Sequence, residues 1–136
     1  MDLLIDTNIL IDVIVHRDEF FSCSKEIYDK CVNKLCNGYV AAHSITNMNY
    51  ILRKSISDEV RRKILISICE LFTVVGLDSQ KLVSALHRSE FSDFEDCLQD
   101  ECAIDINADY IITRNKEDYE ASRIKAVTPA EFLKIC

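Results

Sequence analysis

The chain alternates short apolar runs, which end at polar residues, with longer stretches in which apolar residues recur at helical spacing. The short runs predict strands at about 2–6, 39–42, 72–77, 109–113 and 125–127. The longer stretches predict helices at about 8–14, 19–37, 44–55 and 79–88, and helices that begin near residues 57, 92 and 128. Continuously apolar strands that alternate with helices are typical of a sheet covered on both faces. We therefore expect an α/β fold with a mainly parallel sheet.

Local signals predict several helix ends. Gly38 is expected to end the long helix before it. Ser92 and Glu95 have the spacing of a capping box, in which each side chain accepts a hydrogen bond from the backbone N–H of the other residue. Thr128 and Glu131 have the same spacing. These two pairs predict where the last two helices begin.

The composition limits the kind of protein that this sequence encodes. Its 136 residues have the usual size of one domain, include only two glycines and one proline, and carry a net charge of −7. We expect a single domain over residues 1–136, without the basic surface that broad attraction to nucleic acid requires. No apolar run reaches the roughly 20 residues of a membrane helix, and no signal peptide begins the chain, so a cytoplasmic location is expected.

The seven cysteines include no CxxC pair. Most of them occupy apolar positions of predicted helices, where a free cysteine acts as a small hydrophobic side chain. We therefore expect neither a zinc site nor a disulfide framework.

Polar side chains follow three of the predicted strands. Asp6 follows the first strand, residues 44–47 follow the second and residues 113–115 follow the fourth. Ligands of an open α/β sheet bind beyond the carboxyl ends of its strands. Three segments that are distant in the sequence are thus expected to bring polar groups to one edge of the sheet.

The predicted helix near residue 93 adds further carboxylates. Asp93, Asp96 and Asp100 are spaced three and four residues apart and so share one helix face. Asp93 also suits the first turn of a helix, and Asp100, like Asp12, is also explained as a solvent-facing charge. Two carboxylates 4 Å apart repel by about 4 kcal/mol at an effective dielectric constant near 20, so a cation should compensate them.

The oxygen donors at this edge favour a hard divalent ion, Mg²⁺ or Mn²⁺. A water molecule held on such an ion is acidified, as hydrolysis of a phosphodiester requires. Asp6 and Asp96 are the expected ligands, with Thr7 or Asn8 fixing the geometry.

Five segments resemble the PIN domain family, the metal-dependent ribonuclease fold that includes the VapC toxins of bacterial toxin–antitoxin pairs. The segments are "LLIDTNILID" at 3–12, "AHSITNMNYILRK" at 42–54, "DFEDCLQDECA" at 93–103, "ADYIITRNKEDY" at 108–119 and "VTPAEFL" at 127–133. They occur in family order along the whole chain. The resemblance implies a three-layer sandwich in which helices flank a central, mainly parallel five-stranded sheet, with the first strand in the middle.

The resemblance also implies an acidic pocket for one or two Mg²⁺ or Mn²⁺ ions, endonuclease activity on RNA, a small antitoxin partner and a homodimer. Asp6 matches the first catalytic aspartate and Asp96 the aspartate on the later helix, with Asp93 as its acidic companion. Asn115 and Asp118 are assigned to the same catalytic set. The supporting positions are Thr7, Asn8, Ser44, Asn47 and Thr113.

Two asparagines depart from the usual family pattern. Asn47 stands where a glutamate is common, and Asn115 stands where an aspartate is common, although relatives with the "TRN" form share it. Amide oxygens can still bind a cation, but two negative charges are lost. Asp6, Asp93 and Asp96 would still hold one Mg²⁺, whereas Asn47 leaves a second ion in question.

Basic residues and one histidine near the predicted pocket are candidates for contact with the substrate. Arg114 and Lys116 are expected to hold the RNA backbone. Arg53 and Lys54 would do the same or only form a solvated helix end, and His43 would either pack or contact phosphate.

Two alternatives to the ribonuclease hypothesis stay open. In the first, Asn47 marks a degenerate PIN domain that binds RNA or a partner protein without catalysis. The second is phosphoryl transfer, since receiver domains and dehalogenase-type phosphatases also place an aspartate after the first strand. Such phosphatases require a second aspartate where this chain has Asn8, and receivers require a lysine where it has Arg114.

Overall fold

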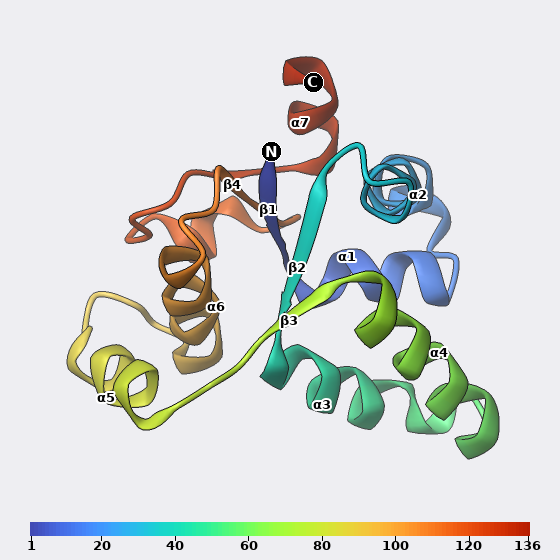
Figure 1. Cartoon of the computed structure of the whole chain (residues 1–136), viewed down its shortest axis with the longest axis horizontal. Helices are drawn as coiled ribbons and strands as arrows, with labels where there is room; N and C mark the ends of the chain where they lie inside the picture. Colours follow the sequence, from blue (N-terminus) through green and yellow to red (C-terminus); the bar gives the residue numbers. More distant parts are fainter.

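The computed structural model describes residues 1–136 as five strands, seven α-helices and two short 3₁₀ helices, η1 and η2 (Figure 1). The elements in chain order are β1 (Asp2–Ile5), α1 (Thr7–Ile14), α2 (Asp18–Val32), β2 (Asn37–Ala41), α3 (Ala42–Ile51), η1 (Leu52–Lys54), α4 (Asp58–Leu71), β3 (Thr73–Val75), α5 (Ser79–His87), α6 (Phe94–Asp105), β4 (Tyr110–Ile112), η2 (Lys116–Tyr119), β5 (Ala126–Val127) and α7 (Pro129–Ile135).

The five strands form one parallel sheet in the order β3-β2-β1-β4-β5. The central strand is β1, in which Leu4 pairs with Tyr39 of β2 on one side and with Ile111 of β4 on the other. The expected α/β class, the parallel five-stranded sheet and the central position of the first strand are confirmed. Because all strands are parallel, their carboxyl ends meet at one edge.

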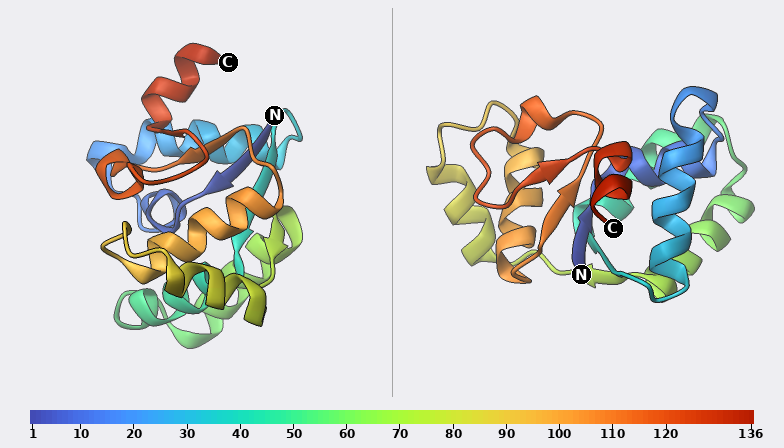
Figure 2. Two further views of the ribbon diagram at one scale, coloured as in Figure 1. Left: turned by 90° about the vertical axis from the view of Figure 1, so that its left-hand side faces the viewer. Right: turned by 90° about the horizontal axis from the view of Figure 1, so that it is seen from above.

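Successive side chains of β1 enter two different cores. Leu3 and Ile5 pack with apolar residues of α1, α2, α3, α4 and α7, whereas Leu4 packs against α6 on the other face. The views in Figure 2 show α5 and α6 on one side of the sheet and α2 and α4 on the other. Both faces are covered, which explains why the strands are apolar throughout rather than alternating.

Gly38 does not end a helix, contrary to the expectation. Helix α2 stops at Val32, and Gly38 lies inside β2. A Cβ atom at this position would lie 2.6 Å from the ring of Phe72 and 2.9 Å from the Cβ atom of Cys31. The glycine is needed because α2 and the segment before β3 approach the strand closely, and the chain turns after α2 at Lys34, which has a φ of 61°.

The capping box expected at Ser92 is also wrong, whereas the one at Thr128 is confirmed. The N-cap of α6 is Asp93, whose Oδ1 accepts a hydrogen bond of 3.0 Å from the backbone N–H of Asp96. An aspartate caps a helix as well as a serine does, so the sequence pattern alone does not decide between neighbouring positions. At α7, Thr128 and Glu131 make both reciprocal bonds, at 3.2 and 2.9 Å.

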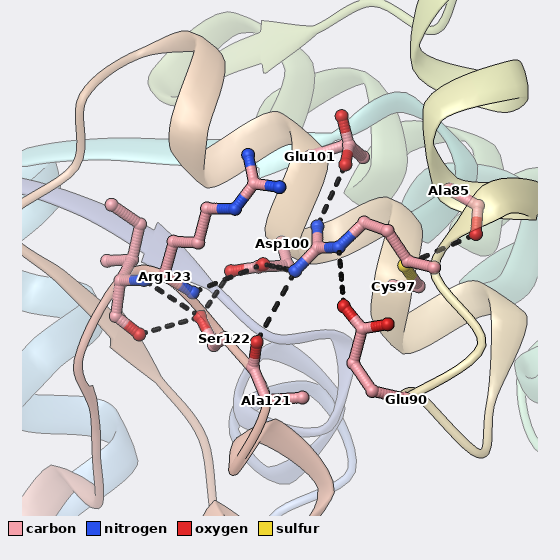
Figure 3. Close-up of polar contacts among 10 residues, drawn as sticks. Ala85, Glu90, Cys97, Asp100, Glu101, Ala121, Ser122 and Arg123 are labelled. Carbon is pink, nitrogen blue, oxygen red and sulfur yellow. Dashed lines mark hydrogen bonds and ion pairs between the residues drawn. The ribbon is translucent and has the colours of Figure 1, made fainter.

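A buried ion-pair network joins the two helices on the second face. Asp100 is fully buried, so its interpretation as a solvent-facing charge was wrong. Its Oδ2 lies 2.5 Å from Nη2 of Arg88, while Nη1 of Arg88 lies 2.8 Å from Glu101. Ser122 and the backbone N–H of Arg123 also donate to Asp100 (Figure 3). The network fastens the end of α5 and the segment after η2 to α6.

All seven cysteines are free thiols, and five of them are at least partly buried. Burial raises the pKa of Cys31 to about 12 and that of Cys102 to about 11, so both stay uncharged in the core. None of the helices has the length and apolar character that crossing a bilayer demands.

Candidate metal centre

A largely polar pocket of about 370 Å³ opens beyond the carboxyl ends of the central strands. It is formed by the start of α1, one side of α3 along its length and the first two turns of α6. The lining residues are Asp6, Thr7, Asn8, His43, Asn47, Tyr50, Ile51, Glu95, Asp96 and Gln99.

Asp6 is positioned by the pairing of β1 with β4. Its backbone N–H donates to the carbonyl of Ile112 at 3.0 Å, which continues the parallel ladder one residue beyond β1. The hydroxyl of Thr113, the residue after β4, donates to Oδ2 of Asp6 at 2.8 Å. Only 7% of Asp6 is exposed, and this burial raises its pKa although the Thr113 bond opposes the shift. The carboxylate is thus fixed in direction and short of positive charge.

Asp96 lines the same pocket from the first turn of α6. Tyr119 donates from its hydroxyl to Oδ1 of Asp96 at 3.4 Å. Burial raises the pKa of Asp96 to about 7, and the negative charges of Asp93, Asp6 and Asp118 add to the shift. The effect of Asp6 on this pKa places the two pocket carboxylates within electrostatic reach of each other. Without a cation, they are an energetically unfavourable pair.

Three polar side chains hold the helices around the pocket. Gln99 of α6 donates from Nε2 to the hydroxyl of Ser44 at 2.8 Å and toward Thr7 at 3.4 Å, and Thr7 donates to Ser44 at 2.8 Å. Only 3% of Gln99 is exposed, and its Oε1 has no hydrogen-bond partner. The sequence analysis did not single out Gln99, although it follows Asp96 by three residues and therefore shares its helix face.

The α3 side of the pocket carries His43 and Asn47. Nε2 of His43 lies 3.1 Å from the backbone carbonyl of Glu95, and its buried Nδ1 has no partner. Burial lowers the pKa of His43, so the ring is neutral at pH 7. The Nδ2 atom of Asn47 donates to Oε2 of Glu95 at 3.3 Å. Glu95, another residue that the sequence analysis did not assign to the site, therefore borders the pocket.

Three of the five residues predicted as catalytic lie outside the pocket lining. The carboxylate of Asp93 caps α6 and is exposed. Asn115 donates through its backbone N–H to the Thr113 hydroxyl at 3.1 Å, which supports the residue that orients Asp6. Asp118, in η2, raises the pKa of both Asp6 and Asp96 but borders a neighbouring pocket.

The two basic residues expected to hold RNA are engaged elsewhere. Nε of Arg114 lies 2.9 Å from Oδ2 of Asp12, which is fully buried rather than solvent-facing as expected, and the guanidinium lies 4.0 Å from the ring centroid of Phe20. Lys116 forms an ion pair of 2.9 Å with Glu131 on the surface. Arg114 serves as the counter-charge of a buried carboxylate, a role that its position after a strand did not indicate.

The rim of the pocket presents a different arginine. Tyr50 is 64% exposed and borders the pocket, and the guanidinium of Arg53 lies 3.7 Å from its ring centroid. The aromatic ring and the positive charge together offer a surface on which an unpaired base or a phosphate can rest.

The donor set suits a hard divalent ion that keeps most of its water. The pocket offers the carboxylates of Asp6 and Asp96 and the unpartnered Oε1 of Gln99, all of them oxygen donors. No three His, Cys, Asp or Glu side chains stand close enough to enclose a metal ion between them. Mg²⁺ does not require such a cage, because one or two carboxylates are its usual protein ligands.

Solved structures of low sequence identity share this fold. A chain in the crystal structure of VapBC2 from Rickettsia felis, bound to a DNA fragment from its promoter, aligns over 94% of this chain and 98% of its own, with a TM-score of 0.70 and 17% identity. A chain of VapBC-1 from nontypeable Haemophilus influenzae aligns over 96% and 99%, with a TM-score of 0.72 and 14% identity. A chain of a toxin–antitoxin complex from Klebsiella pneumoniae aligns over 93% of this chain and 97% of its own, with a TM-score of 0.69 and 21% identity.

No curated protein matches the chain in sequence. The family profile described as PIN domain, in contrast, matches residues 2–117, which is most of the chain and includes every residue of the pocket. By this match, and with the five segments in family order on the parallel sheet, the chain belongs to the PIN domain family.

Proposed function

We propose that this protein is an endoribonuclease that depends on Mg²⁺ or Mn²⁺ and acts as the toxin of a toxin–antitoxin pair. The observation that carries the proposal is that Asp6 and Asp96 line one polar pocket, where burial and neighbouring negative charges, including that of Asp6, raise the pKa of Asp96. PIN domains are generally nucleases that use divalent metal ions, which supports the same reaction for this chain.

The residues of the pocket have distinct tasks in this proposal. A bound Mg²⁺ or Mn²⁺ would supply an acidified water and polarise the phosphodiester. Asp6, oriented by Thr113, and Asp96 hold the ion as ionised carboxylates. Gln99 would offer its unpartnered Oε1 as a hydrogen-bond acceptor beside the ion. His43 borders the pocket with an unpartnered Nδ1; because its neutral ring donates from Nε2 to the carbonyl of Glu95, Nδ1 can accept a hydrogen bond, as from a water molecule.

An antitoxin partner and a homodimer belong to the proposal as well. The solved structures of the same fold include VapBC and toxin–antitoxin complexes, which supports a small antitoxin protein as the partner of this chain. Helix α5 exposes Leu82, Val83 and Leu86, and side chains of this size are exposed together where proteins associate. We place the pair in the cytoplasm, where RNA is found.

A cleavage assay tests the proposed reaction. Purified protein is mixed with a single-stranded RNA and with Mg²⁺, Mn²⁺ or EDTA, and Asp6→Asn and Asp96→Asn variants are purified in parallel. Cleavage by the wild type that requires the metal and is lost in both variants is the expected result. Equal cleavage by the variants would refute the assignment of the site, and it would expose a contaminating nuclease if EDTA also failed to stop it.

A second candidate function is RNA or protein binding by a PIN domain that has lost catalysis. Asn47 favours it, because an amide stands in the pocket where the family commonly has a carboxylate. The Asn47→Glu variant separates the two functions. An inert wild type and an active Asn47→Glu variant would show that the natural protein has lost catalysis, whereas an active wild type would exclude this second candidate.

A further inference from the structure

We propose that the carboxylate of Glu95 replaces the acidic side chain missing at position 47, and that Asn47 is the residue that positions it. Asn47 and Glu95 come from α3 and α6, and both line the pocket that holds Asp6 and Asp96. The inference rests on the proposed function, since it concerns the ligands of the same metal ion. In this proposal Asn47 is not the site of a lost metal ligand. It is a residue that positions a metal ligand on another helix.

Helix α3 holds Glu95 at two separate points. The amide of Asn47 donates to the side-chain Oε2 at 3.3 Å, and the ring of His43 lies 3.1 Å from the backbone carbonyl of the same glutamate. A glutamate in the first turn of a helix would otherwise be free to extend into solvent. The His43 contact fixes the backbone at Glu95, and the Asn47 bond restrains the carboxylate beside the pocket and leaves Oε1 without a protein partner.

The chemistry of the amide fits this role better than a carboxylate would. An asparagine can donate a hydrogen bond to a carboxylate, whereas a glutamate at position 47 would place a second negative charge beside Glu95. The usual family residue and Glu95 are therefore alternatives for one negative charge. The pocket retains its charge, supplied from α6 instead of α3.

A second, independent observation, made on Gln99, indicates that a ligand binds on this side of the pocket. It follows Glu95 by four residues and so lies on the same face of α6. Its Nε2 is bound to Ser44, but its Oε1 is buried without any partner, which is costly unless a ligand or its water is bound there. Glu95 and Gln99 thus offer two free oxygens along one side of the pocket.

A different explanation is that Glu95 only stabilises α6, because its negative charge lies near the positive, N-terminal end of the helix dipole. In that case its replacement would change stability and leave metal affinity alone. Mn²⁺ affinity, measured on the full chain by calorimetry or by the electron paramagnetic resonance of free Mn²⁺, distinguishes the two roles.

Four variants make the measurement specific. Glu95→Gln is expected to weaken Mn²⁺ binding by about 10-fold, and Asn47→Ala by less, because only the support is lost. The double variant Asn47→Glu with Glu95→Gln is expected to recover the wild-type affinity, because the charge is moved back to α3. Glu26→Gln, which removes an exposed carboxylate of α2 outside the pocket, is the matched control and should bind Mn²⁺ as the wild type does.

The outcomes separate this inference from the proposed function. Unchanged Mn²⁺ affinity in Glu95→Gln, with affinity lost in Asp96→Asn, would overturn the role of Glu95 and leave the nuclease proposal standing. Glu95-dependent Mn²⁺ binding without RNA cleavage would support the inference and refute the nuclease. A wild type that binds no Mn²⁺ would overturn both. Thermal unfolding of each variant in EDTA shows whether it is folded.

Discussion

Replacing Asp96 by asparagine should stabilise the metal-free protein at alkaline pH. The pKa of Asp96 rises from 3.8 to about 7 on folding, so the folded chain keeps a proton on this side chain that the unfolded chain releases near pH 4. Between these pH values the folded state binds more protons, and the free energy of unfolding therefore falls as the pH rises toward 7. Asparagine does not titrate between pH 4 and 7, so the Asp96→Asn variant should not lose stability in this range for this reason.

The size of the effect follows from the same shift. At about 1.4 kcal/mol for each pH unit, moving a pKa from 3.8 to about 7 corresponds to about 4 kcal/mol. Asp96 is only partly buried, and screening by water reduces the cost of its ionised form to about 2 kcal/mol. We expect the variant to exceed the wild type by this amount at pH 8 and to match it near pH 4.

Urea unfolding followed by circular dichroism at both pH values, with EDTA present, measures the difference. The Glu26→Gln variant serves as the control for removal of an exposed carboxylate. Adding Mg²⁺ at pH 8 should then stabilise the wild type and not the variant, because a cation that binds only the folded state raises its stability. A variant that is less stable than the wild type at pH 8 in EDTA would refute the reasoning that burial, with the neighbouring carboxylates, makes ionised Asp96 destabilising.

Three further predictions concern the supports of the fold and the rim of the pocket. Arg88→Met should lower the free energy of unfolding by about 3–5 kcal/mol, because it leaves Asp100 buried without its counter-charge, and adding Asp100→Leu should restore most of this; a loss that persists in the double variant would contradict the electrostatic explanation. Gly38→Ala should lower stability by about 1–3 kcal/mol in a thermal or urea titration, whereas Gly76→Ala, where a Cβ atom meets nothing within 4 Å, should not; equal effects would argue against the close approach at β2. Arg53→Gln should weaken binding of a labelled RNA, measured by fluorescence anisotropy, and leave Mn²⁺ affinity unchanged; a parallel loss of both would place Arg53 in the metal site.

The layout of the sheet could be predicted from the sequence because its signals are local. The strands are short apolar runs, and all except β4 are followed by a helix with an apolar periodicity, so the α/β class follows from pattern alone. The carboxyl edge of a parallel sheet then places Asp6 and the residues after β4 together, as the Thr113 bond to Asp6 bears out. The prediction succeeded where spacing within one element decides the contact.

The environment of the charged residues could not be predicted in this way. Asp12 and Asp100 read as surface charges because nothing near them in the sequence reveals that Arg114 and Arg88 will meet them in the core. The partner of a buried charge comes from tertiary packing, which spacing along one helix does not encode. For the same reason, the sequence indicated only a capping role for Glu95. In the structure α3 packs beside α6 and places the amide of Asn47 next to the Glu95 carboxylate.

The central position of β1 has a consequence for the order of events during protein synthesis. Asp6 is made well before the threonine that orients it, which follows 107 residues later, directly after the strand that pairs with β1. While β4 is still inside the ribosome, it cannot pair with β1, and α6 is not yet docked. The pocket of such a nascent chain is incomplete. The pocket can therefore assemble only after β4 has been made and has paired with β1, so the proposed nuclease should be inactive in shorter nascent chains.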